Sequence, residues 1–424
     1  MRSTRIVAAS LVGVVVCGLA VPSAVAASAR ATTSHTAQAL SARSSPAKGV
    51  RLALPAPSGR YATGESSFRL VDDERTDPWV PGQPYRELMI SVFYPSVHTG
   101  GRPVTHQFPP AVATAFGTAV EQSAELPAGL VNWAATTTHS VRDAVLAPGR
   151  FPVVLYSPGA GDPRDWNVSL AEDLASRGFV VVTVDHTGET PAVQFPDGHV
   201  VGNEPLMTAW AAAIENGTTP ALLTKVMAAR TADTKLVLDR LKSLPNRLTR
   251  IMDAHRIGMF GQSGGGFTAA QAMYGDPRIR AGVNMDGTLE YTSEPDGTHL
   301  SEVALHGLDR PFLLMGNSSA ADGSDVHHEP SWASFWRNQR GWKADVTLND
   351  SVHASFTDAK ALLPQLAGRV PVEKLDAAVG KVDPHLAVAA NRALVTSFFN
   401  RFLKGRDDHL LDGGASPYPI TFVR

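Results

Sequence analysis

The fold can be read from the stretch Ile257-Gly258-Met259-Phe260-Gly261-Gln262-Ser263-Gly264-Gly265. Its first four residues form a short apolar run, and its last five are the only G-x-S-x-G motif in the chain. Apolar residues at helical spacing then continue to Tyr274. The pattern predicts a strand, a sharp turn that exposes the Ser263 hydroxyl, and a helix. Glycines flank this turn because a side chain there would collide with the neighbouring strand and helix.

On both sides of this stretch, short apolar runs alternate with segments of helical periodicity. The runs predict strands at 88–94, 151–156, 179–184, 257–260, 281–285, 312–315 and 344–348, and the periodic segments predict helices at 166–176, 222–244, 265–274, 332–340 and 385–403. Such alternation indicates an α/β fold with a mostly parallel central sheet and helices on both faces. Ligands of these sheets bind at the carboxyl ends of the strands, so the chemistry is expected there.

The N-terminus has the pattern of a secretory signal peptide over residues 1–26. Arg2 and Arg5 precede an apolar segment at 6–21, and Ala24-Val25-Ala26 supplies the small residues of a cleavage site. A membrane anchor is the alternative, but the run is short and no charged stop follows it. A lipoprotein signal is disfavoured because a valine, not a small residue, precedes the cysteine of this run. We expect a secreted protein with no stable membrane span.

The rest of the chain is expected to form one catalytic domain. Residues 27–50 are rich in Ala, Ser and Thr without apolar periodicity, which is typical of a disordered linker. The domain then spans 51–424. Two segments, at 96–150 and 186–221, exceed the usual length of a connection and carry apolar residues. We predict that they form cap-like insertions that wall the substrate site.

Charge and cysteine content restrict the possible partners and cofactors. The 38 basic and 40 acidic residues nearly balance and form no long basic run, so a nucleic acid partner is not expected. The one cysteine, Cys17, lies in the predicted signal peptide, which excludes disulfides and a cysteine nucleophile from the mature chain. The run Asp325-Val326-His327-His328-Glu329 is better interpreted as a polar loop than as a metal site. We expect no cofactor, and the oligomeric state stays open.

A serine nucleophile needs two N–H donors for the oxyanion that forms during acyl transfer. The first is expected to be the backbone N–H of Gly264, directly after the nucleophile. The second comes from the turn after an earlier strand, which here is Ser157-Pro158-Gly159-Ala160-Gly161. We place it at Ala160, with Gly159 or Gly161 as the alternatives.

The general base should be a histidine on a loop after a late strand, since the chain order in such enzymes is serine, acid, histidine. His353 fits, because it follows the predicted strand at 344–348. His327 and His328 are its rivals. The pair Asp185-His186 precedes the serine, so we expect it to cap a strand end or to wall the cleft.

The acid is expected to be Asp286. It directly follows the predicted strand at 281–285, which fixes it rigidly, and buried carboxylates are rare unless they are paired. Asp322 and Asp325, in the polar loop after the next strand, are the alternatives.

Six stretches of the chain resemble a known family between about Arg86 and Lys404. They are Ser91-Val92-Phe93-Tyr94-Pro95, Phe151-Pro152-Val153-Val154-Leu155-Tyr156-Ser157-Pro158-Gly159, Leu174-Ala175-Ser176-Arg177-Gly178-Phe179-Val180-Val181, Gly261 to Gly265, Met285-Asp286, and Ser351-Val352-His353-Ala354-Ser355-Phe356. The chain resembles the plasma and type II platelet-activating factor acetylhydrolases and their bacterial secreted lipase-like relatives.

The resemblance implies an α/β-hydrolase fold and hydrolysis of a small-molecule or lipid-like carboxylic ester through an acyl-enzyme. It implies Ser263, Asp286 and His353 as the catalytic triad, and the N–H groups of Ala160 and Gly264 as the oxyanion hole. The chain departs from the family at two positions, because Pro158 and Gln262 stand where relatives usually have histidine. These departures concern the shape of the acyl and leaving-group pockets.

Two other functions remain as alternatives to an acetylhydrolase-like esterase. One is a polyester or triacylglycerol hydrolase of the cutinase-lipase type, and the other is a non-catalytic binding protein on the same fold. Cleavage of amides also stays open, since the same triad serves esters and amides.

Overall fold

The computed structural model describes residues 49–97, 101–292, 295–318 and 326–423. The predicted signal peptide at 1–26 and nearly all of the predicted linker at 27–50 lie outside the described residues.

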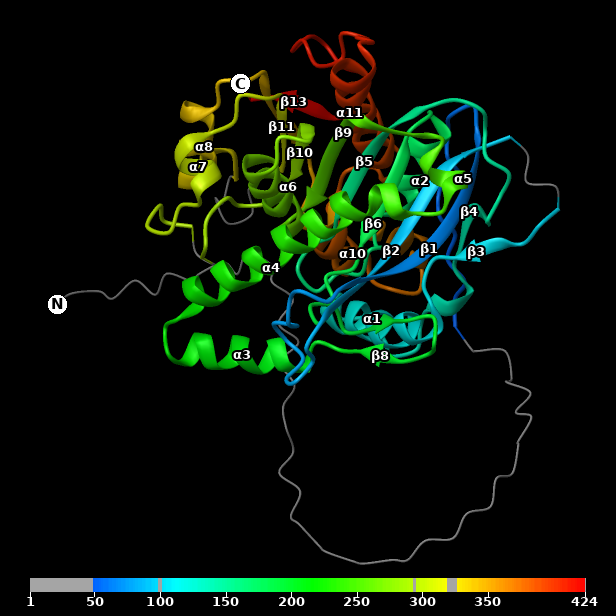
Figure 1. Ribbon diagram of the computed structural model, residues 1–424. Coiled ribbons are helices and arrows are strands. Elements are labelled where there is room, and N and C mark those ends of the chain that lie inside the picture. The colour runs from blue at the N-terminus through cyan, green and yellow to red at the C-terminus, as the bar shows by residue number, and fades with distance from the viewer. Residues whose placement is uncertain (1–48, 98–100, 293–294, 319–325, 424) are drawn as a thin grey trace, which may run out of the picture.

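A central sheet of 11 strands runs through the molecule, in the order β13-β12-β11-β10-β9-β5-β6-β2-β1-β4-β3 (Figure 1). The strands are β1 (Ala62–Asp72), β2 (Arg86–Ser96), β3 (Val104–His106), β4 (Thr137–Arg142), β5 (Phe151–Ser157), β6 (Val180–Val184), β9 (Met252–Gln262), β10 (Ile279–Met285), β11 (Phe312–Asn317), β12 (Lys343–Leu348) and β13 (Ile420–Phe422). Six adjacent strands of the sheet are parallel to one another, namely β12, β11, β10, β9, β5 and β6. β2 pairs antiparallel with β6, and β13 pairs antiparallel with β12. The fold is therefore α/β with a mostly parallel sheet, as predicted.

Helices cover both faces of this sheet (Figure 1). The helices are α1 (Pro110–Ser123), α2 (Val168–Ser176), α3 (Glu204–Glu215), α4 (Thr219–Arg240), α5 (Asn246–Thr249), α6 (Gly264–Gly275), α7 (Glu302–His306), α8 (Pro330–Asn338), α9 (Ala359–Leu362), α10 (Val372–Val379) and α11 (Pro384–Lys404). Successive residues of β5 point to opposite faces, as the pleat requires. Val154 and Tyr156 pack in one buried cluster with α2 and α11, and Val153 and Leu155 pack in another with α4, α6 and α8.

The two long segments contain secondary structure of their own. Segment 96–150 holds β3, α1 and β4, and segment 186–221 holds α3 and the small hairpin of β7 (Val193–Gln194) and β8 (Val200–Val201). α1 packs by its Phe116 ring against Trp166, at a centroid separation of 4.9 Å. Trp166 lies on the connection between β5 and α2, so the first long segment is anchored beside the end of β5.

All seven predicted strands and five predicted helices correspond to observed elements, with shifts of a few residues at their ends. β1 was missed, because its buried positions include the polar residues Glu65 and Ser66 in place of an apolar run. The strand predicted at 88–94 ends before Pro95, whereas β2 extends through Pro95 to Ser96. β2 continues through Pro95 because its pairing with β6 has already ended at Phe93, so β6 requires no N–H from the proline.

Candidate active site

Ser263 occupies the turn between β9 and α6, in a conformation that a non-glycine residue rarely adopts. Its φ is 56° and its ψ is −126°. The Ser263 N–H donates to the Met285 carbonyl at 2.8 Å, and the Ser263 carbonyl accepts from the N–H of Gly266 at 2.9 Å. The backbone is thus held on both sides of a half-buried serine. It is a strand–turn–helix arrangement of the kind that presents a nucleophile.

The glycines of the motif are needed for the close approach of this turn to its surroundings. A Cβ on Gly261 would lie 2.1 Å from the carbonyl carbon of Gly265. A Cβ on Gly265 would lie 1.9 Å from the carbonyl oxygen of Ser157, at the end of β5. Either contact is far inside van der Waals distance. Gly264 is different, since a Cβ there would meet its first neighbour at 3.5 Å.

His353 and Asp286 come together from two strand ends. His353 begins the 3-10 turn His353–Phe356 after β12, and Asp286 follows β10 directly. Nδ1 of His353 lies 2.6 Å from Oδ2 of Asp286. The Asp286 carboxylate also accepts from the backbone N–H of Asn317 at 2.8 Å and from its side-chain amide at 2.7 Å. Asp286 is buried, whereas 29% of the His353 side chain is exposed.

The other ring nitrogen of His353 contacts the residue next to Ser263. Nε2 of His353 lies 3.0 Å from the amide nitrogen of Gln262. Because Nδ1 donates to Asp286, Nε2 carries the lone pair and accepts from Gln262. In the described part of the chain the Ser263 hydroxyl makes no hydrogen bond. The structure therefore brings His353 to Asp286 and to the nucleophile turn, while a direct bond from His353 to Ser263 stays a prediction.

The predicted oxyanion donors lie side by side. A Cβ on Gly264 would be 3.5 Å from the backbone nitrogen of Ala160 and 3.6 Å from Nη1 of Arg230. Arg230, on α4, donates to the carbonyl oxygens of Pro158 and Gly159 at 2.8 and 3.1 Å. The loop after β5 and the first residue of α6 thus meet at one point. No sequence pattern indicated Arg230, because its position in the middle of a helix gives no sign of where its side chain ends.

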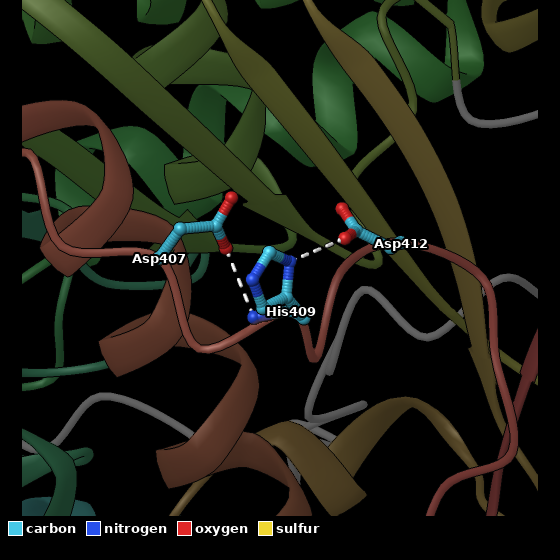
Figure 2. A group of neighbouring side chains, drawn as sticks. All are labelled: Asp407, His409 and Asp412. Atoms are coloured by element: carbon cyan, nitrogen blue, oxygen red, sulfur yellow. Dashed lines mark hydrogen bonds and ion pairs between the residues drawn. The ribbon is translucent and has the colours of Figure 1, made fainter.

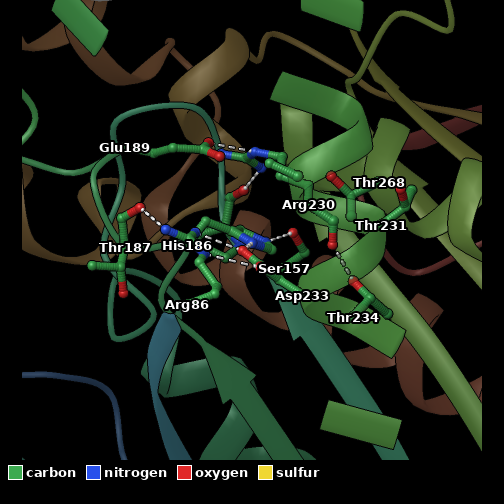
Figure 3. A network of polar contacts seen from close by, with 12 residues as sticks. Arg86, Ser157, His186, Thr187, Glu189, Arg230, Thr231, Asp233, Thr234 and Thr268 are labelled. Atoms are coloured by element: carbon green, nitrogen blue, oxygen red, sulfur yellow. Dashed lines mark hydrogen bonds and ion pairs between the residues drawn. The ribbon is translucent and has the colours of Figure 1, made fainter. Parts of the chain in front are cut away.

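A second set of serine, histidine and aspartate lies at the end of β5 (Figure 3). Ser157 Oγ is 2.9 Å from Nε2 of His186, and Nδ1 of His186 is 3.1 Å from Asp233. All three residues are at most 2% exposed, and Asp233 also forms ion pairs with Arg75 and Arg86. Burial lowers the pKa of His186 below its ordinary value, which favours the neutral imidazole. Since no substrate can reach Ser157, this set is a structural support and Ser263 stays the nucleophile candidate.

The structure describes the histidine rivals of His353 but not the aspartate rivals of Asp286. His327 is 2% exposed, and its two ring nitrogens contact Asp345 at 2.5 Å and Thr347 at 2.9 Å, both on β12. Asp322 and Asp325 lie outside the described residues.

Comparisons with known proteins point to one family of hydrolases. Residues 51–201 match the family described as "Platelet-activating factor acetylhydrolase, isoform II". The chain is 28% identical to a "Probable 1-alkyl-2-acetylglycerophosphocholine esterase" of Arthroderma benhamiae over 402 residues, which cover 87% of this chain and 93% of that one. It is 22% identical to the platelet-activating factor acetylhydrolase of Cavia porcellus over 60% of this chain and 58% of that one.

A solved structure agrees with these sequence matches. The chain superposes on a ferulic acid esterase from Streptomyces cinnamoneus with a TM-score of 0.70 and 33% sequence identity, covering 88% of this chain and 99% of the other. The chain belongs to the platelet-activating factor acetylhydrolase-like α/β-hydrolases. It is an ester hydrolase.

In the part of the chain that the structure describes, no helix of this acetylhydrolase-like protein combines the length and the apolar character needed to span a bilayer.

One group of side chains in this acetylhydrolase-like hydrolase has the composition of a metal site (Figure 2). Asp407, His409 and Asp412 lie together on the exposed segment after α11. Arg401 contacts the carboxylates of Asp407 and Asp412 at 3.2 and 2.9 Å, and Nδ1 of His409 lies 2.8 Å from Asp412. These carboxylates already have a cationic partner, which would repel a metal ion, so we interpret the group as a surface ion-pair cluster.

Burial and charge act in opposite directions on the residues around His353. Burial lowers the pKa of His353, but the hydrogen bond to Asp286 and the charges of Asp286 and Asp162 raise it above its ordinary value overall. Burial would raise the pKa of Asp286, yet His353 and Asn317 hold it below its ordinary value. Burial raises the pKa of Asp162 to about 7, against the positive charges of His353 and Arg230.

These shifts predict the acid limb of the activity profile. Only a neutral imidazole can accept the proton of a serine, so kcat/KM should fall on acidification around a midpoint above 6.5, the ordinary pKa of histidine. Asp162→Asn removes a carboxylate that stabilises the imidazolium, which should move the midpoint to lower pH. The measurement is the pH dependence of kcat/KM with p-nitrophenyl acetate.

Asp197→Asn, on the exposed turn between β7 and β8, is the control and should leave the midpoint in place. An acid limb that stays unchanged or moves upward in Asp162→Asn would show that this carboxylate does not act on the base.

Proposed function

We propose that this ester hydrolase is a secreted serine esterase in which Ser263, His353 and Asp286 form the catalytic triad. One observation carries the proposal. His353 contacts Asp286 at 2.6 Å through Nδ1 and contacts Gln262 through Nε2. Gln262 is the residue directly before Ser263, whose backbone is held at positive φ. A nucleophile turn, an imidazole in the correct tautomer and a buried carboxylate are the three parts that acyl transfer requires.

In the first half of the reaction, Ser263 Oγ forms a bond to the ester carbonyl carbon while Nε2 of His353 takes the hydroxyl proton. The carbonyl oxygen becomes an oxyanion, which accepts hydrogen bonds from the N–H groups of Ala160 and Gly264. When the tetrahedral intermediate collapses, the bond to the alcohol oxygen breaks. His353 then returns its proton to that oxygen, and the alcohol leaves.

In the second half, water attacks the acyl-enzyme and gives one proton to His353. The second collapse breaks the bond to Ser263 Oγ, which regains its proton from His353, and the carboxylic acid leaves. Asp286 keeps Nδ1 protonated throughout and stabilises the imidazolium.

The side-chain amide of Gln262 donates a hydrogen bond to Nε2 of His353, whose lone pair this mechanism needs. This amide must therefore release Nε2 of His353 before the imidazole can accept the serine proton. The carbonyl oxygen of the Gln262 side chain lies close to Gly159, since a Cβ on Gly159 would be 2.6 Å from it. Gln262 is thus placed where substrate meets the oxyanion loop, and a bound ester is expected to displace its amide.

Replacement of the two serines tests which Ser-His-Asp set reacts. Ser263→Ala should lower kcat/KM for p-nitrophenyl acetate at least about 1,000-fold and abolish covalent labelling by a fluorophosphonate probe. Ser157→Ala removes the serine of the buried set, and it should keep the labelling because Ser157 is 0% exposed. Labelling that survives Ser263→Ala, or wild-type protein that never labels, would contradict the proposal. The second result would favour a non-catalytic binding protein.

We propose that the acyl group of the substrate is short. Four aromatic side chains beside the end of β5 pack on one another and are 2–5% exposed, namely Phe108, Phe116, Trp133 and Trp166. Rings buried in this way offer no apolar surface along which a long acyl chain could lie. The names of two relatives, an acetylglycerophosphocholine esterase and an acetylhydrolase, agree with this interpretation.

A substrate panel separates the esterase classes. Rates on p-nitrophenyl esters from acetate to palmitate should be highest for the shortest chains, with a short-acyl phospholipid and methyl ferulate tested beside them. Peak rates on palmitate, tributyrin or a polyester film would contradict the short-acyl proposal and favour the lipase or polyesterase alternative. A matched p-nitroanilide, expected to react far more slowly, distinguishes ester from amide cleavage.

We also propose secretion, on the support of the charged start, apolar segment and Ala24-Val25-Ala26 site of the N-terminus. Amino-terminal sequencing of the exported protein should find Ala27 as its first residue. Retention of residues 1–26 on a protein that stays inside the cell would contradict this proposal.

A further inference from the structure

Arg230 is a buried arginine whose guanidinium donates two of its three hydrogen bonds to the loop that follows β5. It lies on α4 and is 1% exposed. Its Nη1 and Nη2 donate to the carbonyl oxygens of Pro158 and Gly159, and its Nε donates to Glu189 at 2.6 Å (Figure 3). Burying a charged group is costly unless it is paired and hydrogen-bonded, and here Glu189 supplies the pairing. The remaining donors hold backbone.

The carbonyl of Gly159 belongs to the same peptide unit as the N–H of Ala160. A peptide unit is planar and normally trans, so its carbonyl oxygen and its N–H point in opposite directions. A hydrogen bond that fixes the Gly159 oxygen on the side of Arg230 therefore fixes the Ala160 N–H on the other side. If this peptide rotated, its carbonyl oxygen would take the place of the N–H. The oxyanion would then lose a donor and face the negative end of a carbonyl dipole.

A second contact holds Ser157, the last residue of β5, which directly precedes this loop. Ser157 Oγ contacts Nε2 of His186 at 2.9 Å, and Nδ1 of His186 contacts Asp233, which lies one helical turn after Arg230 on α4. One face of α4 thus reaches the loop through Arg230 directly and through Asp233 and His186. Helix α4 therefore supports this region at two points, beside the bond that the Asp162 N–H donates to the Gly159 carbonyl at 3.2 Å.

We propose that Arg230 is a positioning residue for the oxyanion hole, one that fixes the orientation of the Gly159–Ala160 peptide through the Gly159 carbonyl. The inference rests on the proposed serine-esterase function. It predicts that Arg230 acts on the transition state and leaves substrate binding in the ground state unchanged.

The test uses the full mature protein with the variants Arg230→Lys and Glu189→Gln/Arg230→Met. The double variant removes both charges, so that no unpaired carboxylate is left behind. We expect kcat for p-nitrophenyl acetate to fall about 30-fold in the double variant, as part of the loss seen when one oxyanion donor is removed. KM should stay within about twofold. The inhibition constant of a trifluoromethyl ketone, which forms an oxyanion on the serine, should weaken by the same factor as kcat.

Arg230→Lys should recover part of the activity, since one ammonium can still reach one of the two carbonyls. The matched control is Arg392→Gln on α11. Arg392 is also a buried arginine that donates to backbone carbonyls, those of Pro55, Ala56 and Ser169. Arg392→Gln should lower the melting temperature but leave kcat and the ketone affinity within about twofold of the wild-type values.

Arg230 variants whose kcat and ketone affinity match those of Arg392→Gln would overturn the inference, as would a raised KM with unchanged kcat. If the double variant does not fold, Arg230→Lys gives the same readouts on its own. Activity that survives in Ser263→Ala would instead overturn the proposed function. An inactive Ser263→Ala beside normal Arg230 variants would overturn this inference alone.

Discussion

The contact between the nucleophile turn and the end of β5 constrains the rest of the site. Gly265 lies so close to the Ser157 carbonyl that one methyl group would be 1.9 Å from its oxygen. This approach places Ser263, Gly264 and the backbone of Ala160 in one corner at the carboxyl edge of the sheet. The serine of this corner has a strained backbone, whose φ is positive. A site built in this way depends on backbone positions, which the parallel strands keep rigid.

Behind this corner, buried charges hold the loop that the chemistry needs. Arg86 pairs with Asp77 and Asp233, and Arg230 pairs with Glu189, all with little or no exposure. Removing one partner of such a pair typically costs about 3–5 kcal/mol, because the other charge is left unpaired in the interior. The serine, histidine and aspartate of this network have the hydrogen-bond order of a catalytic triad. Exposure and backbone conformation, and not the order of contacts, distinguish this buried set from the proposed triad of Ser263, His353 and Asp286.

Much of the fold and part of the site could be predicted because they depend on local pattern. Apolar runs and helical periodicity locate the core strands and helices, and the residues that follow strands locate Asp286 and His353 at one edge of the sheet. β1 could not be found, since its buried Glu65 is satisfied by the hydroxyl of Ser91 on β2, a partner 26 residues away.

The supporting residues of the site lay beyond sequence reasoning for a similar reason. Arg230 reaches a loop 72 residues earlier in the chain, and the Gln262 amide turns toward a histidine 91 residues later. Both contacts depend on the direction of one flexible side chain, which no spacing encodes.

The central claim is that the Ser263 hydroxyl, on the turn after β9, attacks the ester while His353 accepts its proton. A crystal structure of the protein inactivated by a p-nitrophenyl phosphonate ester tests it most directly. The account predicts a phosphorus bond to Ser263 Oγ, the phosphonyl oxygen on the N–H groups of Ala160 and Gly264, and Nε2 of His353 released from Gln262. A phosphonate bonded to any other residue, or an oxygen pointing away from both N–H groups, would contradict it.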